Sequence, residues 1–429
     1  MGIRIVGARA LDPASGTDEL ADIFVQGGAI VGIGRAPRGF KARREIAAPG
    51  CIVAPGLVDL GARLREPGYE HKATIASEAR AAVRGGVTTL CAMPDTNPIL
   101  DTPAVLEQIH HCAGAARAAR VMCIGALTVG LDGEVLAEMH ALKAAGCVGV
   151  TNLERTVKDT AVLKHALAYA ASADLTVFLH SEDYWLGRQG HMHEGATSTR
   201  LGIPGIPGAA EVIGLHRDLT LVADTGARAH LCRVTSGDAL KPIIDARRAG
   251  LPVTADTALL NLLFTDEDVR NFDANFHVRP PLRGTRDRAA LRQGIRRGVL
   301  DAIGAYHEPH DADAKAAPFA LAEPGASTLD TFLPALLGLV EKGAFDLRTA
   351  FVAASLAPNR ILGLPGGRLE VGAPADLCVF DPDETWEVAP PDLASSGRNN
   401  PLLGERMRGR NRLTLVGGNV VFDALGRRT

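Results

Sequence analysis

The sequence predicts an α/β fold in which a (β/α)8 barrel of the TIM type carries a small β-sandwich built from both chain termini. Between about residues 50 and 360, short apolar runs alternate with amphipathic helical stretches, eight times in succession. Both ends of the chain instead consist of short apolar runs broken by glycine and proline. We therefore predict a barrel domain over residues 56–365 and a sandwich domain from residues 1–55 plus 366–429.

The barrel elements follow one another in a regular order. The candidate strands are LVDL, GVTTLCAM, ARVMCIGAL, CVGVTN, LTVFLH, ARAHLCRV, LPVTAD and LDAIGA. Amphipathic helices are predicted between them, with clear examples at residues 72–84, 103–117, 160–171 and 287–297. Long connections follow the fifth strand (183–207) and the eighth (308–327), and connections of this length are usually functional or disordered.

Length and composition bound the classes of function. A chain of 429 residues exceeds the usual single core, which agrees with one large and one smaller domain. The formal net charge of −3 favours neither nucleic acid nor an anionic membrane as a partner. No apolar run approaches the roughly 18 residues of a membrane span, and the N-terminus lacks the apolar region of a signal peptide. Seven scattered cysteines without a C-x-x-C pair indicate reduced thiols in a cytoplasmic protein.

The stretch VDLGARLREPG ends the first barrel strand, where barrel chemistry is normally located. Residues i and i+2 of a strand share one face, so Gly61 and Arg63 point the same way. Glycine has no side chain, and arginine is a permanent cation without a lone pair for a metal. These two neighbouring positions therefore offer no ligand to a metal ion.

Nearly the whole chain resembles the dihydroorotases of the amidohydrolase superfamily, specifically the long bacterial type. The resemblance is carried by APGLVDLGARLREPGYEHKATIASEARAAVRGGVTTLCAMPDTNPILD and later by LGIPGIPGAAE, TDEDVRNFDANFHVRPPLR and PADLCVFDP. It implies a barrel of the amidohydrolase kind. It also implies zinc held by a His-x-His pair after strand 1, an acidic residue or carboxylated lysine after strand 4, and histidines after strands 5 and 6. An aspartate after strand 8 would act as general base.

This chain departs from that pattern at most positions of the site. The corresponding residues are Gly61 and Arg63 after strand 1, Asn152 after strand 4, His180 after strand 5, Arg233 after strand 6 and Tyr306 after strand 8. Only the histidine after strand 5 matches. In the substrate pocket that the resemblance implies, Arg65 matches a carboxylate-binding arginine, whereas Asp95 and Arg279 replace asparagines. We therefore predict that the zinc site is lost, that no cofactor is bound and that the chain is not an enzyme.

Several residues leave alternatives open. His180 is expected to be a hydrogen-bonded pocket residue, but together with His191, His193 or His307 it could form a rearranged metal site. Arg63 and Arg233, the two arginines after strands 1 and 6, could point in either of two directions. Either they fill the space of the metal ions and pair with acids such as Asp59 or Asp95, or they point into solvent at the barrel mouth.

The resemblance implies a function as well. Some bacteria carry an inactive dihydroorotase homologue that assembles with aspartate transcarbamoylase, the preceding enzyme of pyrimidine synthesis. The hypothesis is a pseudoenzyme that acts as a structural subunit, with the transcarbamoylase catalytic chain as its partner, and that forms a dimer or another homo-oligomer. One alternative is an active zinc-dependent dihydroorotase with a rearranged site. The other is a non-catalytic sensor that binds an anionic pyrimidine precursor through Arg65 and Arg279.

Overall fold

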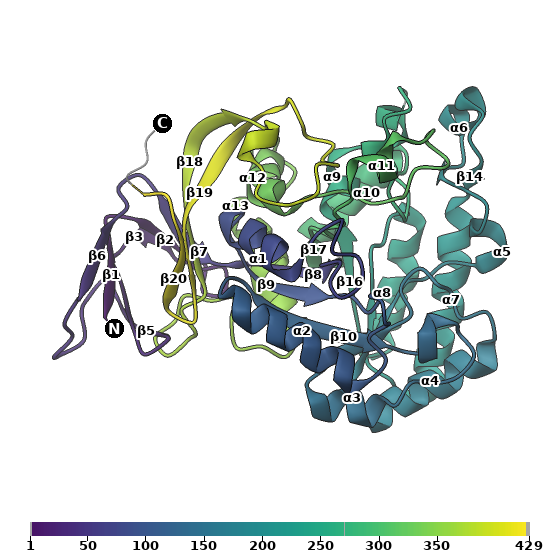
Figure 1. Ribbon diagram of the computed structural model, residues 1–429, viewed down its shortest axis with the longest axis horizontal. Helices are drawn as coiled ribbons and strands as arrows, with labels where there is room; N and C mark the ends of the chain where they lie inside the picture. Colours follow the sequence, from purple (N-terminus) through teal and green to yellow (C-terminus); the bar gives the residue numbers. More distant parts are fainter. Residues whose placement is uncertain (1, 270, 426–429) are drawn as a thin grey trace.

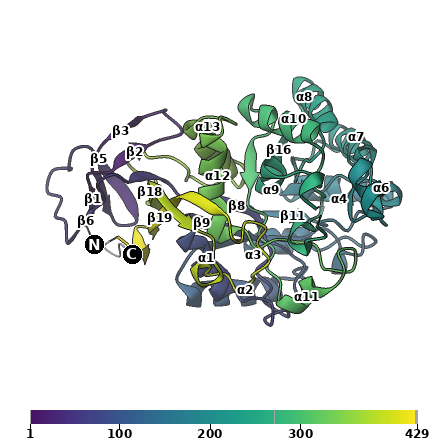
Figure 2. The same cartoon turned by 90° about the horizontal axis from the view of Figure 1, so that it is seen from above.

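The fold consists of a β-sandwich at one end of the molecule and a barrel at the other (Figure 1). The computed structural model describes residues 2–269 and 271–425. The chain begins in the sandwich, passes through the barrel and returns to the sandwich, so that purple and yellow strands lie side by side (Figures 1 and 2).

Eight parallel strands form the barrel sheet, in the spatial order β17-β16-β15-β12-β11-β10-β9-β8. They are β8 (Leu57–Ala62), β9 (Val87–Ala92), β10 (Arg120–Ala126), β11 (Gly149–Thr151), β12 (Thr176–Leu179), β15 (Ala229–Leu231), β16 (Val253–Ala258) and β17 (Ala302–Gly304). The last strand lies beside the first, where the Arg63 amide N–H donates to the His307 carbonyl at 2.8 Å. The sheet is therefore nearly closed, and the predicted (β/α)8 barrel is confirmed.

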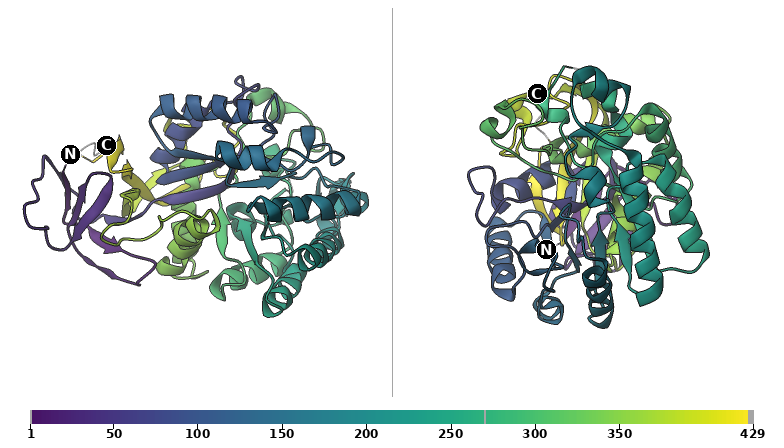
Figure 3. Two further views of the ribbon diagram at one scale, coloured as in Figure 1. Left: turned by 90° about the horizontal axis from the view of Figure 1, so that it is seen from below. Right: turned by 90° about the vertical axis from the view of Figure 1, so that its right-hand side faces the viewer.

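Helices cover the outside of this sheet (Figure 3). The main ones are α1 (Ile75–Arg84), α2 (Pro103–Ala116), α3 (Met139–Ala145), α4 (Thr160–Ser172), α7 (Gly208–Thr225), α8 (Leu240–Arg248), α10 (Thr285–Arg296) and α12 (Phe332–Glu341). Shorter helices are α9 (Leu259–Leu263), α13 (Leu347–Phe351) and α14 (Ala357–Ile361). Helix α1 begins three residues later than the predicted residue 72. The reason is a capping box in which the Thr74 hydroxyl accepts from the Ser77 amide.

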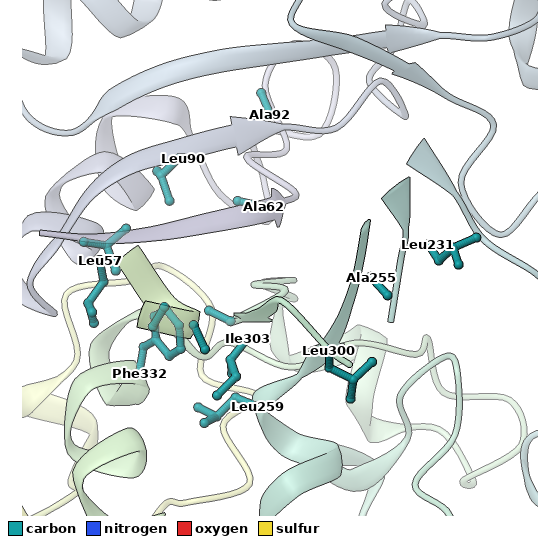
Figure 4. Close-up of a cluster of buried hydrophobic side chains, with 14 of the residues drawn as sticks. Leu57, Ala62, Leu90, Ala92, Leu231, Ala255, Leu259, Leu300, Ile303 and Phe332 are labelled. Atoms are coloured by element: carbon teal, nitrogen blue, oxygen red, sulfur yellow. The ribbon is translucent and has the colours of Figure 1, made fainter. Parts of the chain in front are cut away.

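The largest hydrophobic core lies between the barrel strands and these helices. Figure 4 shows Leu57 and Leu90 of the neighbouring strands β8 and β9 in one cluster with Ile303 of β17, Leu259 of α9 and Phe332 of α12. All five are essentially inaccessible to solvent. This layer of apolar side chains fixes the strands and so determines where their carboxyl ends, and the side chains that follow them, are placed.

The sandwich contains two sheets, with strand orders β5-β4-β1-β6 and β20-β19-β18-β7-β2-β3. Its strands are β1 (Ile3–Val6), β2 (Arg9–Leu11), β3 (Asp18–Leu20), β4 (Ile23–Gln26), β5 (Ala29–Ile33), β6 (Arg44–Ala47), β7 (Ile52–Pro55), β18 (Leu377–Glu387), β19 (Arg406–Val416) and β20 (Asn419–Asp423). Antiparallel pairing of β7 with β18 joins the two ends of the chain, as expected. Residues 1 and 426–429 of the predicted sandwich lie outside the described residues, and the exact domain boundaries stay a prediction.

The two long connections after strands 5 and 8 contain short elements of their own. The first holds α5 (Tyr184–Gly187), β13 (Met192–His193), α6 (Ala196–Leu201) and β14 (Gly205–Ile206), and the second holds α11 (Ala312–Ala316). Both follow carboxyl ends of barrel strands and so lie on the side where barrel sites form. Within the described part of the chain, none of the helices has the length and apolar character needed to cross a membrane.

Candidate site at the barrel mouth

The barrel brings most of the predicted positions to one place. Gly61 lies in β8, His180 directly follows β12, and Arg233 and Tyr306 lie two residues beyond β15 and β17. Asn152 follows β11 but turns away from the others. Its amide oxygen accepts from the Thr128 hydroxyl at 2.7 Å, and its amide nitrogen donates to the carbonyl of Leu131, which follows β10, and to that of Arg155 in its own loop. These residues therefore lie at the carboxyl ends of the barrel strands, and Asn152 links the loops that follow β10 and β11.

The guanidinium group of Arg63 is surrounded by carboxylates. Its Nε donates to Asp95 at 2.6 Å, and its two terminal nitrogens donate to Glu154 at 2.6 Å and Glu308 at 2.7 Å. The side chain is only 10% exposed. Burial by itself lowers the pKa of Arg63, but the carboxylates of Asp95 and Glu308 outweigh it and raise the pKa above the ordinary value. The arginine is therefore a fixed, buried cation with an ion-pair partner on each nitrogen.

Arg233 reaches the same cluster from the other side of the mouth. It pairs with the second oxygen of Glu154, and its Nη1 donates to the Arg279 carbonyl at 2.7 Å. Its guanidinium carbon lies 4.9 Å from the ring centroid of Tyr306. Burial and the charge of Arg63 lower the pKa of Arg233 to about 10, which still leaves it protonated at neutral pH.

Both arginines therefore point inward. Of the two acids predicted as their partners, Asp95 pairs as expected, whereas Asp59 instead accepts the backbone N–H groups of Tyr306 and His307. Glu154 and Glu308 were not predicted as members of this site. Each stands two residues after a changed strand-end position, and that proximity was the only available signal.

Gly61 and Tyr306 are complementary in shape. A Cβ atom added at Gly61 would lie 2.4 Å from the Tyr306 ring, and one added at Gly304 would lie 2.7 Å from it. The ring therefore packs against two glycines, and its hydroxyl donates to Asp256. Burial, followed by the charge of Asp256, raises the pKa of Tyr306 well above its ordinary value, so the phenol stays protonated. A histidine at position 61 would require this tyrosine to move.

The residues of the predicted substrate pocket are also engaged with protein groups. Arg65 is buried and donates to the Pro309 carbonyl at 3.0 Å and to Glu308 at 3.2 Å. Arg279 donates to Glu182 at 2.5 Å. An anionic ligand would have to compete with these carboxylates, so nothing in this geometry favours the sensor hypothesis. The Glu308 pKa lies well below its ordinary value because Arg63, His310 and Arg65 outweigh the effect of burial.

The histidines do not assemble into a replacement metal site. His307 Nε2 lies 2.6 Å from Glu78, His193 Nδ1 lies 3.2 Å from Arg283, and the His191 ring lies against the His277 ring at 5.5 Å. Neither ring nitrogen of the buried His180 has a hydrogen-bond partner among the described residues, so its expected hydrogen bonding is wrong. The cavity beside it is about 10 Å³, room for about one water molecule.

The donor set at the mouth does not fit the zinc site that the resemblance implies. Both oxygens of Glu154 are held by arginines, as are both oxygens of Glu308. Within residues 2–269 and 271–425, no three His, Cys, Asp or Glu side chains are grouped to hold a metal ion. Zinc requires about three such donors, and two fixed guanidinium cations would repel it.

The sequence of the chain matches two protein-family models and several known proteins. The Dihydro-orotase-like family model matches residues 50–239, and the Amidohydrolase family model matches residues 338–422. A "Dihydroorotase-like protein" of Pseudomonas putida is 48% identical over 98% of this chain and 99% of its own length. A protein of the same name from Pseudomonas aeruginosa is 46% identical over 99% of this chain and all of its own length.

Other matches carry the name of an enzyme. A "Dihydroorotase" of Anaeromyxobacter sp. (strain K) is 42% identical over 98% of this chain and 97% of its own length. Among solved structures, the L-hydantoinase of Arthrobacter aurescens superimposes with a TM-score of 0.86, covering 98% of this chain and 96% of its own. At 23% identity, the match to the L-hydantoinase structure supports the shared fold alone.

One prediction requires correction. We expected the chain not to be an enzyme, because five of six strand-end positions differ from the pattern of an active site. Relatives named Dihydroorotase match it at 42% and 40% identity over nearly its whole length, and this points to an enzyme. The replacement of side chains at the strand ends was too weak a basis for the prediction that the chain is not an enzyme. By its similarity to relatives over nearly its full length, and by the family models it matches, the chain belongs to the dihydroorotase-like family of amidohydrolases.

Proposed function

We propose that this dihydroorotase-like chain acts in pyrimidine biosynthesis as a structural subunit for the assembly of aspartate transcarbamoylase. The partner is suggested by the resemblance described in the sequence analysis. The observation that carries the proposal is the ion-pair cluster at the barrel mouth, in which Arg63 and Arg233 occupy the strand ends. This role is independent of any reaction that the chain catalyses.

The cluster supports an assembly role because of the segments that it joins. Asp95 follows β9, Glu154 follows β11 and Glu308 follows β17, and Arg63 contacts all three. These connections are the parts of a barrel that ordinarily move around a substrate. Ion pairs that hold them together give a surface that is already ordered before a partner binds, and this lowers the entropic cost of association.

Two relatives give further support. The proteins at 48% and 46% identity are named "Dihydroorotase-like protein", whereas the relative at 42% is named "Dihydroorotase". The distinct name is consistent with a role separate from, or additional to, dihydroorotate hydrolysis.

The test is co-expression with the aspartate transcarbamoylase catalytic chain of the same organism. We expect the two chains to elute together, and light scattering should give one defined stoichiometry. The chain alone, in a parallel run, is expected to form a dimer or another homo-oligomer. Two separately eluting proteins, with the transcarbamoylase chain assembled and fully active by itself, would refute the assembly role.

A further inference from the structure

The connection after strand β12 contacts the rest of the barrel mouth through His193. This residue ends strand β13, and its Nδ1 lies 3.2 Å from Arg283 Nη1. Because a guanidinium group can only donate hydrogen bonds, Nδ1 is the acceptor, and the neutral ring carries its proton on Nε2. A protonated ring has no acceptor to offer to Arg283. This contact therefore exists only while His193 is neutral.

Arg283 is fixed in its position. The residue is 3% exposed, its Nε donates to the Thr235 hydroxyl at 3.0 Å, and its Nη1 donates to the Ile206 carbonyl at 2.6 Å. The same carbonyl accepts the Glu194 amide N–H at 3.1 Å, so both of its lone pairs are already used. A proton on Nδ1 of His193 would thus meet a buried cation and no free acceptor.

The other ring nitrogen of His193 faces a space that two carboxylates share. A Cβ atom added at Gly284 would lie 4.0 Å from His193 Nε2, 4.0 Å from Asp266 Oδ1 and 3.8 Å from Asp287 Oδ2. In the part of the chain that the structure describes, neither carboxylate forms an ion pair with a lysine or arginine. Asp266 is only 7% exposed, and among the same residues its carboxylate accepts no hydrogen bond. An imidazolium in this space would supply the missing positive charge.

The two protonation states of His193 therefore favour two positions of its ring. Burial, followed by the charge of Arg283, lowers the pKa of His193 below its ordinary value of 6.5, whereas Asp266, Asp287 and the Ile206 carbonyl act in the opposite direction. Because the pKa is lowered in the observed position, the stability of that position is complete above pH 6.5. It is lost as the pH falls through the lower value.

The segment that carries His193 forms one wall of a cavity of about 330 Å³. Gly190, His191 and Ile206 line this cavity together with residues 277–279 and 320–324. The cavity thus lies between the long connections after strands β12 and β17. A change in the position of residues 190–206 would alter its shape.

We infer that His193 is a pH-sensitive latch of the 190–206 segment. Its neutral ring binds Arg283 and holds the wall of the cavity in place. Its protonated ring turns to Asp266 and Asp287 and releases that wall. The shape of this part of the barrel mouth is thereby coupled to pH, independently of the assembly role proposed above.

Hydrogen–deuterium exchange of the full chain at about pH 7.5 and about pH 5.5, corrected for intrinsic rates, tests the latch. At the lower pH, one unit below the ordinary pKa, we expect the amides of residues 190–206 to exchange up to about tenfold faster, and those of helix α4 to stay unchanged. His193→Asn keeps an acceptor near the position of Nδ1 but takes up no proton, so its corrected rates should be equal at both pH values. The matched control, His191→Asn, should keep the wild-type response.

A second variant keeps His193 and removes the charges to which it turns. Asp266→Asn with Asp287→Asn should move the midpoint of the response to lower pH by at least about half a unit, because the imidazolium has lost its partners. Equal rates at both pH values in the wild type, or an unchanged midpoint in this variant, would overturn the latch. A wild-type response in His193→Asn, or faster exchange throughout the chain at the lower pH, would overturn it as well. If His193→Asn exchanges fast at both pH values, its contact with Arg283 has been lost, and the aspartate variant decides.

Discussion

Replacing Arg63 with glutamine tests whether the barrel mouth depends on its internal cation. The substitution keeps a polar side chain of similar reach but removes the charge that faces Asp95, Glu154 and Glu308. Three carboxylates would then face one another, and of the arginine ion pairs those of Arg65 with Glu308 and of Arg233 with Glu154 would remain. A buried charge that is left without an ion-pair partner is among the few causes of a large loss of stability from a single substitution.

The magnitude follows from the burial of the group. Removing one partner from a fully buried ion pair costs about 3–5 kcal/mol, because the remaining charge is left without compensation. Arg63 is 10% exposed and its carboxylate partners are 14–20% exposed, so some water reaches the cluster. We therefore expect a loss at the low end of that range, about 3 kcal/mol of unfolding free energy at neutral pH.

Urea unfolding of matched variants measures this quantity, as the shift of the midpoint at constant slope. The control is Arg408→Gln, which removes two ion pairs, to Glu341 and Asp383, where Arg63→Gln removes three, and which does so from a side chain that is half exposed. Surface pairs contribute about 0–1 kcal/mol, so Arg408→Gln should lie close to the wild type.

Acidification gives an independent check of the cause. The Glu308 pKa is depressed in the folded state, so its interactions contribute stability above its ordinary pKa of 4.5, and that stability is lost as the pH falls through the lower folded value. The difference between wild type and Arg63→Gln should therefore shrink below about pH 4.5. Equal small losses for Arg63→Gln and Arg408→Gln at neutral pH would refute the reasoning that the mouth is held by its buried cation.

Three further predictions concern the same region. Gly61→Ala should lower the free energy of unfolding by about 1–3 kcal/mol, because the added Cβ would overlap the Tyr306 ring. This loss should largely disappear when Gly61→Ala is introduced into the Tyr306→Ala variant. Equal losses with and without Tyr306 would contradict the contact. Hydrogen bonds from His307 and Ser395 outweigh burial and depress the Glu78 pKa below 4.5, so the stability that Glu78 contributes is lost as the pH falls. In Glu78→Gln the free energy of unfolding should therefore fall less steeply with decreasing pH than in the wild type. Protein purified without added metal should contain far less than one zinc per chain by elemental analysis, and a stoichiometric amount would show that the donor set has been misjudged.

The sequence by itself determined the architecture. Alternation of apolar runs with amphipathic helices is a local property, and right-handed parallel crossovers leave few ways to arrange such units other than a barrel. The stretch VDLGARLREPG also showed that positions 61 and 63, which share one face of the first strand, carry no side chain able to bind a metal. Helix boundaries were less predictable, as at α1, where the Thr74 cap decides the start.

The direction of the arginines was decided only by the tertiary structure. Arg63 and Arg233 could have faced solvent, and the choice depended on whether carboxylates from distant strand ends converge on them. Glu308 is 245 residues from Arg63 along the chain, and no local pattern encodes such a pairing. The space available to Tyr306 was equally non-local, since it depends on Gly61 of β8 lying beside it where the first and last strands of the barrel meet. Sequence specifies strands and their side-chain directions, but the partners of a buried charge exist only once the barrel has closed.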